Sequence, residues 1–236
     1  MISGNLISAA IAHPGPKVVG TILTQKYLEA LHPASTTLPC DLVELRVDGF
    51  RDYDQWPETG KAIETAGFPV MMTLRLAKEG GHWNGPDSER LGFFERAVEA
   101  VSGVDIELQS EIAKEVCSLA ANAGKTSLVS YHNFDETPSV SQLTKIIEMG
   151  RAMGNIVKIA TKVNSLDDVE TLRCILQGRW NVPLCIIGMG PLGKETRLRF
   201  PLEGSCFTYG YLDVPGAPGQ FSAEELKKYI RSVANS

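Results

Sequence analysis

Short apolar runs alternate with longer amphipathic stretches along most of the chain. Short apolar runs bounded by turn residues are typical of strands covered on both faces, whereas helical periodicity marks the amphipathic stretches. The apolar runs predict strands over residues 17–22, 42–47, 70–74, 104–108, 126–131, 156–161, 183–187 and 206–211. The amphipathic stretches predict helices over residues 25–31, 53–65, 87–100, 111–123, 139–153, 165–176 and 223–234, with only a short turn near 193–197.

This alternation of strands and helices predicts a parallel sheet with crossover helices. Eight successive units favour closure into a (β/α)8 TIM barrel, and an open doubly wound sheet is the alternative architecture. No charged block, low-complexity segment or long linker divides the sequence, so we expect one catalytic domain over residues 1–236. The first sixteen residues precede the first strand and are expected to cap the barrel floor.

The composition is that of an ordinary globular protein, with 43% hydrophobic and 22% charged residues. A net charge of -5 gives no sign of a polyanion-binding surface, so nucleic acid is not an expected partner. The apolar runs are too short for a membrane span, and the N-terminus lacks the basic region of a signal peptide. Five scattered cysteines without a C-x-x-C pair indicate free thiols and a cytoplasmic protein.

Charged residues interrupt the second predicted strand, which is otherwise apolar. Glu44, Arg46 and Asp48 alternate with apolar residues and therefore share one face of the strand. Charges that point into a barrel need a ligand or an ion-pair network. The sequence leaves two interpretations open, which are a ligand site and a structural pair between Glu44 and Arg46 or a neighbour.

The third and fourth strands also end in charged residues, at the barrel face that builds active sites. Arg75 is placed to bind a carboxylate with two hydrogen bonds, and Gly80 and Gly81 permit backbone turns that other residues resist. An exposed salt bridge in a surface loop is the alternative. Asp105 and Glu107 lie on one side of the fourth strand, where they can orient partners or neutralise neighbouring cations.

Lys158 lies between two apolar residues of the sixth strand and should point into the barrel. Burial of an ammonium group is costly unless it is paired or functional, and burial beside cations favours the free amine that attacks ketones. His132, at the end of the fifth strand, is suited to carrying protons. A salt-bridged lysine and a structural histidine are the alternatives. Two prolines and two glycines shape the last loop, 214–220, where Gln220 can hydrogen-bond a hydroxyl group. An ordinary tight connection between strand and helix is the alternative for this loop.

Taken together, these segments resemble the type I 3-dehydroquinate dehydratase family. The similar segments follow in order from about residue 41 to residue 220. They are E-x-R-x-D at 44–48, L-R-x-x-x-E-G-G at 74–81, S-Y-H-N-F at 130–134, V-K-I-A at 157–160, Arg197, and A-P-G-Q at 217–220. Each segment is weak by itself, but their order and their places at predicted strand ends make the resemblance specific.

The resemblance implies dehydration of 3-dehydroquinate to 3-dehydroshikimate in the shikimate pathway of aromatic amino acid biosynthesis. It implies that Lys158 forms an imine, that His132 is the general acid and base, and that Glu79 orients His132. It assigns binding of the substrate carboxylate and hydroxyls to Glu44, Arg46, Arg75, Arg197 and Gln220. The family needs no metal or organic cofactor and is commonly dimeric, so a homodimer is expected.

One position departs from the family pattern, and two other functions stay open. The family usually carries a serine where this chain has Gly216, and the lost hydrogen bond costs roughly 0.5–1.5 kcal/mol of substrate binding. A class I aldolase-type lyase on the same barrel would share Lys158, although the His132 segment favours dehydration. A non-catalytic barrel that binds a shikimate-like acid is the other alternative.

Overall fold

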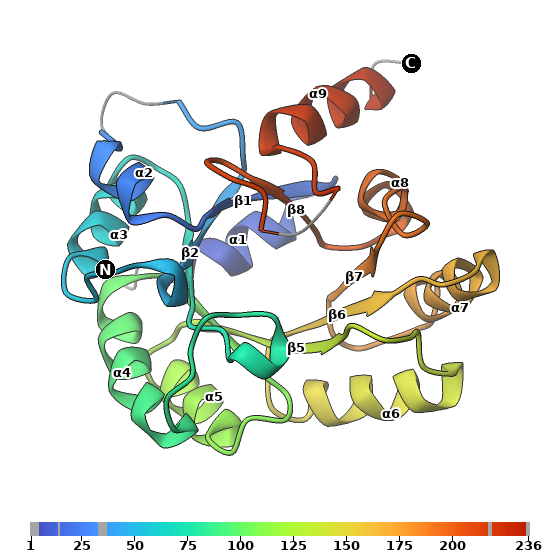
Figure 1. Ribbon diagram of the computed structural model, residues 1–236, viewed down its shortest axis with the longest axis horizontal. Helices are drawn as coiled ribbons and strands as arrows, with labels where there is room; N and C mark the ends of the chain where they lie inside the picture. The colour runs from blue at the N-terminus through green and yellow to red at the C-terminus, as the bar shows by residue number, and fades with distance from the viewer. Residues whose placement is uncertain (1–4, 14, 33–36, 217–218, 235–236) are drawn as a thin grey trace.

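The computed structural model describes residues 5–13, 15–32, 37–216 and 219–234 as strands surrounded by helices (Figure 1). The strands are β1 (Lys17–Ile22), β2 (Leu42–Arg46), β3 (Val70–Thr73), β4 (Gly103–Glu107), β5 (Thr126–Asn133), β6 (Ile156–Lys162), β7 (Leu184–Met189) and β8 (Phe207–Tyr211). All eight lie where the apolar runs predict them. β5, β6 and β7 extend past their predicted ends, and the extension of β5 carries His132 into the sheet.

The strands close into a barrel. They pair in parallel in the order β7-β6-β5-β4-β3-β2-β1-β8, so β1 lies between β2 and β8. The gap between β7 and β8 is bridged where the Cys206 amide donates to the Leu184 carbonyl at 2.8 Å. The predicted TIM barrel is therefore confirmed, and the open doubly wound sheet is excluded.

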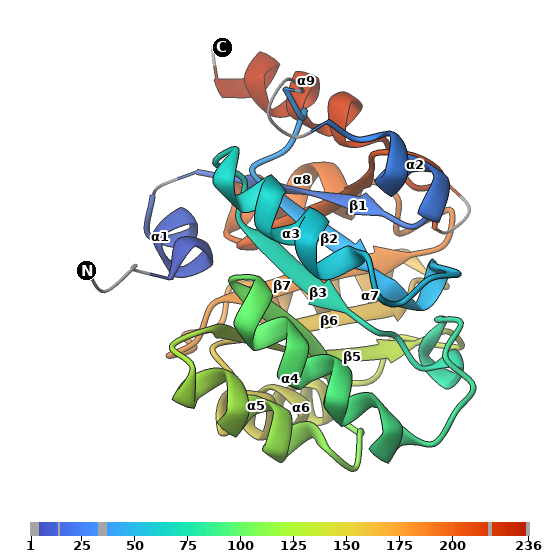
Figure 2. The same cartoon turned by 90° about the vertical axis from the view of Figure 1, so that its left-hand side faces the viewer.

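Helices cover the outside of the barrel (Figure 2). They are α2 (Gln25–Ala30), α3 (Trp56–Thr65), α4 (Leu91–Ala100), α5 (Ala113–Asn122), α6 (Val140–Arg151), α7 (Leu166–Leu176), α8 (Thr196–Glu203) and α9 (Ala223–Ala234). Three 3-10 turns are η1 (Val47–Gly49), η2 (Ala77–Glu79) and η3 (Asp87–Arg90), the last of which leads into α4. In the described part of the chain, no helix has the length and apolar character needed to cross a membrane.

The prediction of only a short turn near 193–197 is wrong, because α8 runs from Thr196 to Glu203. Pro201 lies inside this helix and has no amide hydrogen to donate to the carbonyl of Arg197. The hydroxyl of Thr208 on β8 donates to that carbonyl instead, at 2.8 Å. The neighbouring strand thus satisfies the acceptor that the proline leaves open.

The segment before β1 caps the floor of the barrel, as predicted. α1 (Leu6–Ala12) begins after Asn5, whose side chain accepts from the amides of Ile7 and Ser8. Asn5 also accepts a hydrogen bond from Thr126 at the start of β5, at 2.8 Å. Ile7 is fully buried among residues of the barrel interior, so α1 seals the end at which the strands begin.

Apolar side chains fill the lower half of the barrel interior. The members of this cluster nearest the starts of the strands are Val19, Leu42, Met71, Leu128, Ile156, Cys185 and Phe207. A second apolar layer lies between the strands and the outer helices, where Val157 and Ile159 pack with residues of α6 and α7. The filled floor leaves the carboxyl ends of the strands as the open end, where the polar inward residues gather.

Candidate active site

A single cavity at this open end is lined by every residue that the sequence analysis assigned to the site. These residues are Glu44, Arg46, Arg75, Glu79, His132, Lys158, Arg197 and Gln220. The cavity has a volume of about 120 Å³, which suits a small molecule. Six strands, a 3-10 turn, a helix and the last loop supply its walls, so its shape depends on closure of the whole barrel.

Lys158 is a buried amine that faces the cavity. Its side chain is 8% exposed, and its Nζ donates to Oδ2 of Asp105 at 3.2 Å. The ring of Tyr209 also contacts the amine, with its centroid 4.2 Å from Nζ. The predicted inward orientation is confirmed, and the lysine is held by a carboxylate and an aromatic face.

His132 and Glu79 form a pair at the cavity wall. Nδ1 of His132 lies 2.9 Å from Oε2 of Glu79, and Nε2 forms no hydrogen bond with another described residue. Glu79 ends the turn η2, and Gly80 follows with φ of 78°. A Cβ at Gly80 would lie 2.5 Å from the ring of Phe134, which stacks beside His132. The positive φ favours glycine at this position, so the glycine noted in the sequence helps to place Glu79.

The charges around this pair set its proton affinities. Burial, together with the positive charges of Arg75 and Lys158, holds the pKa of His132 well below its usual range. Burial raises the pKa of Glu79 to about 7, against the opposing effect of the Arg75 guanidinium. At neutral pH the imidazole is therefore neutral, and its free Nε2 is ready to accept a proton.

Arg75 lies in a buried ion-pair network with the two acids of β4. Its Nη2 is 2.7 Å from Asp105, and its Nη1 is 3.3 Å from Glu107. The same Nη1 donates to Ser130 Oγ at 2.6 Å. Burial opposes ionisation of Asp105, but Arg75 and Lys158 hold its pKa below the usual value. Asp105 therefore both neutralises cations and positions Lys158.

The acidic and basic residues of β2 have separate partners. Arg46 donates two hydrogen bonds to Asp48, at 2.9 and 2.8 Å. Glu44 instead accepts from the hydroxyls of Thr21 and Thr73, at 2.8 and 2.9 Å. The alternative of a Glu44–Arg46 pair is wrong, although the neighbour Asp48 does pair with Arg46. β2 ends at Arg46, so Asp48 lies in η1 and not on the strand.

Arg197 and Gln220 close the cavity from α8 and the last loop. Arg197 donates to the Tyr209 carbonyl at 3.4 Å and forms no ion pair within the described ranges; burial lowers its pKa. Gln220 Oε1 accepts from the amide of Gly216 at 2.8 Å. Positions 217 and 218 of the predicted A-P-G-Q segment lie outside the described residues.

Four polar residues touch the site that the sequence analysis did not assign, namely Thr21, Thr73, Ser130 and Tyr209. Strand register explains the places of the first three, because Thr21 pairs with Glu44, Thr73 with Arg46, and Ser130 with Lys158. Period-two alternation puts such residues on the inward face, but the register that brings them to the site is set only in the folded barrel. Among the residues that the structure describes, no group of His, Cys, Asp or Glu side chains is arranged to hold a metal ion.

Comparison with known proteins identifies the family. Residues 21–236 match the family model of type I 3-dehydroquinase. The chain belongs to the type I 3-dehydroquinase family. It is 37% identical over 190 residues to the 3-dehydroquinate dehydratase of Methanothermobacter thermautotrophicus, covering 80% of this chain and 84% of that protein. Identity to the 3-dehydroquinate dehydratase of Methanosarcina barkeri is 36% over 225 residues, with 90% and 93% covered.

Solved structures agree with this placement in the type I 3-dehydroquinase family. The crystal structure of the 3-dehydroquinate dehydratase from Aquifex aeolicus VF5 superposes with a TM-score of 0.78 at 31% identity. The match covers 92% of this chain and 98% of that one. The family resemblance predicted from the ordered segments is confirmed.

Proposed function

We propose that the protein is a 3-dehydroquinate dehydratase, a hydro-lyase that converts 3-dehydroquinate to 3-dehydroshikimate and water in the shikimate pathway. The observation that carries this proposal is the cavity that joins the buried Lys158 amine to the Glu79–His132 pair. An amine and a proton carrier that face the same small-molecule cavity suit dehydration of a ketone through an imine. Membership of the type I 3-dehydroquinase family supports the same chemistry.

In the proposed reaction, Lys158 attacks the ketone carbon of the substrate and forms an imine with loss of water. The protonated imine draws electrons from the neighbouring C2 atom, so the C2 proton becomes acidic enough for His132 to remove. The resulting enamine expels the C1 hydroxyl as water after His132 returns the proton. Hydrolysis of the imine releases the enone product and restores Lys158. The imine is the electron sink, so these side chains suffice for the reaction.

Glu79 has a positioning role in this proposal. Its carboxylate accepts a hydrogen bond from Nδ1 of His132, so the imidazole presents Nε2 to the cavity. When His132 takes up the C2 proton, the neighbouring carboxylate stabilises the imidazolium that forms. The positive charges of Arg75 and Lys158 have the opposite effect, because they lower the pKa of His132 and keep the resting imidazole neutral. The site therefore favours a base that accepts a proton and then releases it readily.

Arg197 is the cation that we assign to the substrate carboxylate. Arg46 is already paired with Asp48, and Arg75 with Asp105 and Glu107. Arg197 has no such acidic partner among the described residues and lies partly buried at the cavity wall, where its guanidinium can bind a carboxylate with two hydrogen bonds. The substrate hydroxyls are left to Glu44 and Gln220, together with the guanidinium N–H groups of Arg46 and Arg75 that face the cavity.

Three further expectations belong to this proposal. The barrel formed by the described residues supports one catalytic domain over 1–236. The homodimer and the cytoplasmic location remain predictions from the sequence. Size-exclusion chromatography with light scattering tests the dimer, and fractionation of cells tests the location.

The test of the proposed function is turnover of 3-dehydroquinate, followed by the ultraviolet absorbance of the conjugated enone. We expect enone formation by the wild-type protein and its loss in Lys158→Ala and His132→Ala, both checked for folding by circular dichroism. Retro-aldol cleavage of a sugar phosphate without enone formation would support the aldolase alternative. Saturable binding of a shikimate-like acid without either reaction would support the binding protein.

A further inference from the structure

Tyr209 is a cavity residue to which neither the sequence pattern nor the proposed mechanism gives a role. It lies on β8 and points into the barrel, where it is only 4% exposed. The tyrosine lines the same cavity as Lys158, and its ring centroid is 4.2 Å from Nζ. Its backbone carbonyl accepts from Arg197 at 3.4 Å, so the residue joins the amine to the cation assigned to the carboxylate.

The hydroxyl of Tyr209 is buried and has no hydrogen-bond partner among the described residues. Buried polar groups in proteins are nearly always paired, so an unpaired hydroxyl on a residue that lines a ligand cavity points to a partner supplied by the ligand. The neighbouring acids form their hydrogen bonds with other residues and not with this hydroxyl. Asp105 holds Arg75, Lys158 and Ser130, and both oxygens of Glu44 accept hydroxyl hydrogens from threonines.

We propose that Tyr209 contacts the substrate directly, and that its hydroxyl hydrogen-bonds the oxygen on the carbon that Lys158 attacks. The inference rests on the proposed function, because it presumes a ketone substrate. The ring centroid lies 4.2 Å from the nitrogen that forms the new bond, so the hydroxyl at the edge of that ring is within reach of an oxygen on the carbon joined to that nitrogen. Tyr209 thereby assists formation and hydrolysis of the imine, while His132 handles the C2 proton.

The step balances without a further reactant. Nζ forms a bond to the ketone carbon, the electrons of the C=O double bond move to oxygen, and that oxygen becomes the hydroxyl of a carbinolamine. The C–O bond then breaks as the nitrogen lone pair forms C=N, and water leaves. Starting from the Lys158 ammonium that pairs with Asp105, two of its protons leave with the oxygen by way of His132. Tyr209 stabilises the negative charge on oxygen and transfers no proton.

The environment of Tyr209 keeps the phenol protonated. Burial, followed by the negative charges of Cys185, Glu44 and Asp105 in their ionised forms, raises the pKa of Tyr209 well above its usual value. The hydroxyl therefore stays a hydrogen-bond donor across the working pH range. The Tyr209→Phe variant should accordingly lower the rate without shifting the pH profile.

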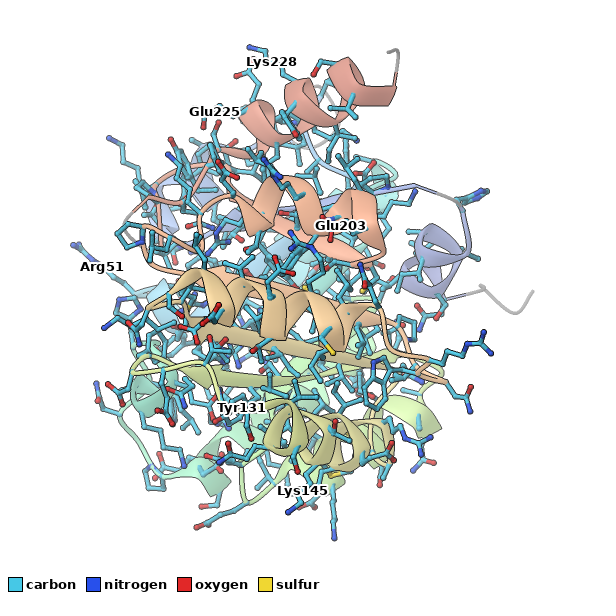
Figure 3. The ribbon with its side chains drawn as sticks, turned by 90° about the vertical axis from the view of Figure 1, so that its right-hand side faces the viewer. Arg51, Tyr131, Lys145, Glu203, Glu225 and Lys228 are labelled. Carbon is cyan, nitrogen blue, oxygen red and sulfur yellow. The ribbon has the colours of Figure 1, made fainter. Side chains whose placement is uncertain are left out.

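The test compares Tyr209→Phe with Tyr131→Phe in time-resolved trapping. Tyr131 lies on β5, on the outer side of the sheet with the residues of α6 (Figure 3). Within the described part of the chain, its hydroxyl accepts one long hydrogen bond, from Asn133 at 3.4 Å. Each variant loses one phenolic oxygen and keeps its ring. Excess enzyme is mixed with 3-dehydroquinate and quenched with borohydride at increasing times. Intact mass then gives the fraction of reduced adduct, and absorbance gives the enone.

We expect Tyr209→Phe to form the adduct about tenfold more slowly than wild type, with Tyr131→Phe unchanged, since one hydrogen bond to a developing charge is lost. The variant should unfold no more easily than wild type, because it removes an unpaired buried hydroxyl. Adduct formation by Tyr209→Phe at the wild-type rate, or equal slowing of both variants, would overturn the inference. If wild type forms neither adduct nor enone, the proposed function itself fails.

Discussion

Oε2 of Glu79 lies 2.9 Å from Nδ1 of His132, although the two residues are 53 positions apart in the chain. The contact brings a turn after β3 to the end of β5, and it depends on Gly80 and on the extension of β5. It fixes which imidazole nitrogen faces the cavity. The first two predictions follow from this pair.

The activity should fall on the acid side of pH about 7, because the pKa of Glu79 is about 7. Below that pH the pair takes up a proton, and Glu79 no longer stabilises the imidazolium. Glu79→Gln should reduce kcat/KM by about 10- to 100-fold and remove this limb of the profile. The measurement is kcat/KM between about pH 5 and pH 9. A variant that keeps the wild-type limb would contradict the assignment to Glu79.

Glu79→Gln should also stabilise the fold at alkaline pH. Burial raises the pKa of Glu79 from 4.5 to about 7, so the folded state resists its ionisation. The stability that the protonated carboxyl contributes is fully present at pH below the unfolded-state pKa of Glu79, and it is lost as pH rises through the folded-state pKa. Urea unfolding should therefore show Glu79→Gln more stable than wild type near pH 8, with the difference shrinking toward pH 4.5. An equal difference at both pH values would refute the buried-carboxyl argument.

Asp105→Asn should destabilise the protein strongly. Asp105 is 1% exposed and compensates two buried cations, Arg75 at 2.7 Å and Lys158 at 3.2 Å. Removing the charge leaves both cations short of a partner, which costs about 3–5 kcal/mol of the free energy of unfolding. The pKa of Asp105 is lower in the folded than in the unfolded protein. Its contribution to stability is therefore present at pH above the unfolded-state pKa and is lost as pH falls through the folded-state pKa.

The control for Asp105 is an exposed ion pair. Glu148→Gln breaks the contact with Arg151 on the surface of α6, and the expected change is less than about 1 kcal/mol. Urea unfolding at neutral pH measures both variants. Similar small losses for the two would mean that the Arg75 network does not depend on Asp105.

Most of the fold could be predicted because apolar runs and helical periodicity repeat without interruption. α8 was missed, since the sequence around Pro201 argues against a helix and gives no hint that Thr208 would satisfy the carbonyl of Arg197. The start of α4 was also shifted, because η3 and α4 read as one amphipathic stretch.

The site residues could be predicted where a charged side chain interrupts an apolar strand, as Lys158 and Glu44 do. Their partners could not, because partnership depends on register between strands. The sequence cannot place Thr21 and Thr73 on either side of Glu44, nor Asp105 between Arg75 and Lys158. Tyr209 was invisible for a further reason, since an aromatic residue in a strand is usually taken as core.

Gly216→Ser should improve substrate binding. A Cβ at this position would have Gln220 Oε1 as its nearest neighbour at 3.5 Å, which is ordinary contact, so the serine side chain fits. The new hydroxyl adds one hydrogen bond to the substrate and should lower KM by about 3- to 10-fold at little cost in stability. Steady-state kinetics with 3-dehydroquinate measures this change. An unchanged or higher KM would show that the last loop does not bring position 216 to the substrate.

The central claim is that Lys158 forms an imine with the substrate. The protein is incubated with 3-dehydroquinate and borohydride, and the reduced adduct is mapped by digestion and mass spectrometry, with Lys158→Arg as the matched control. We predict one adduct, on Lys158, in a protein that forms enone when borohydride is omitted, and no adduct in the variant. An adduct on another lysine, or enone formation by Lys158→Arg at the wild-type rate, would contradict the account.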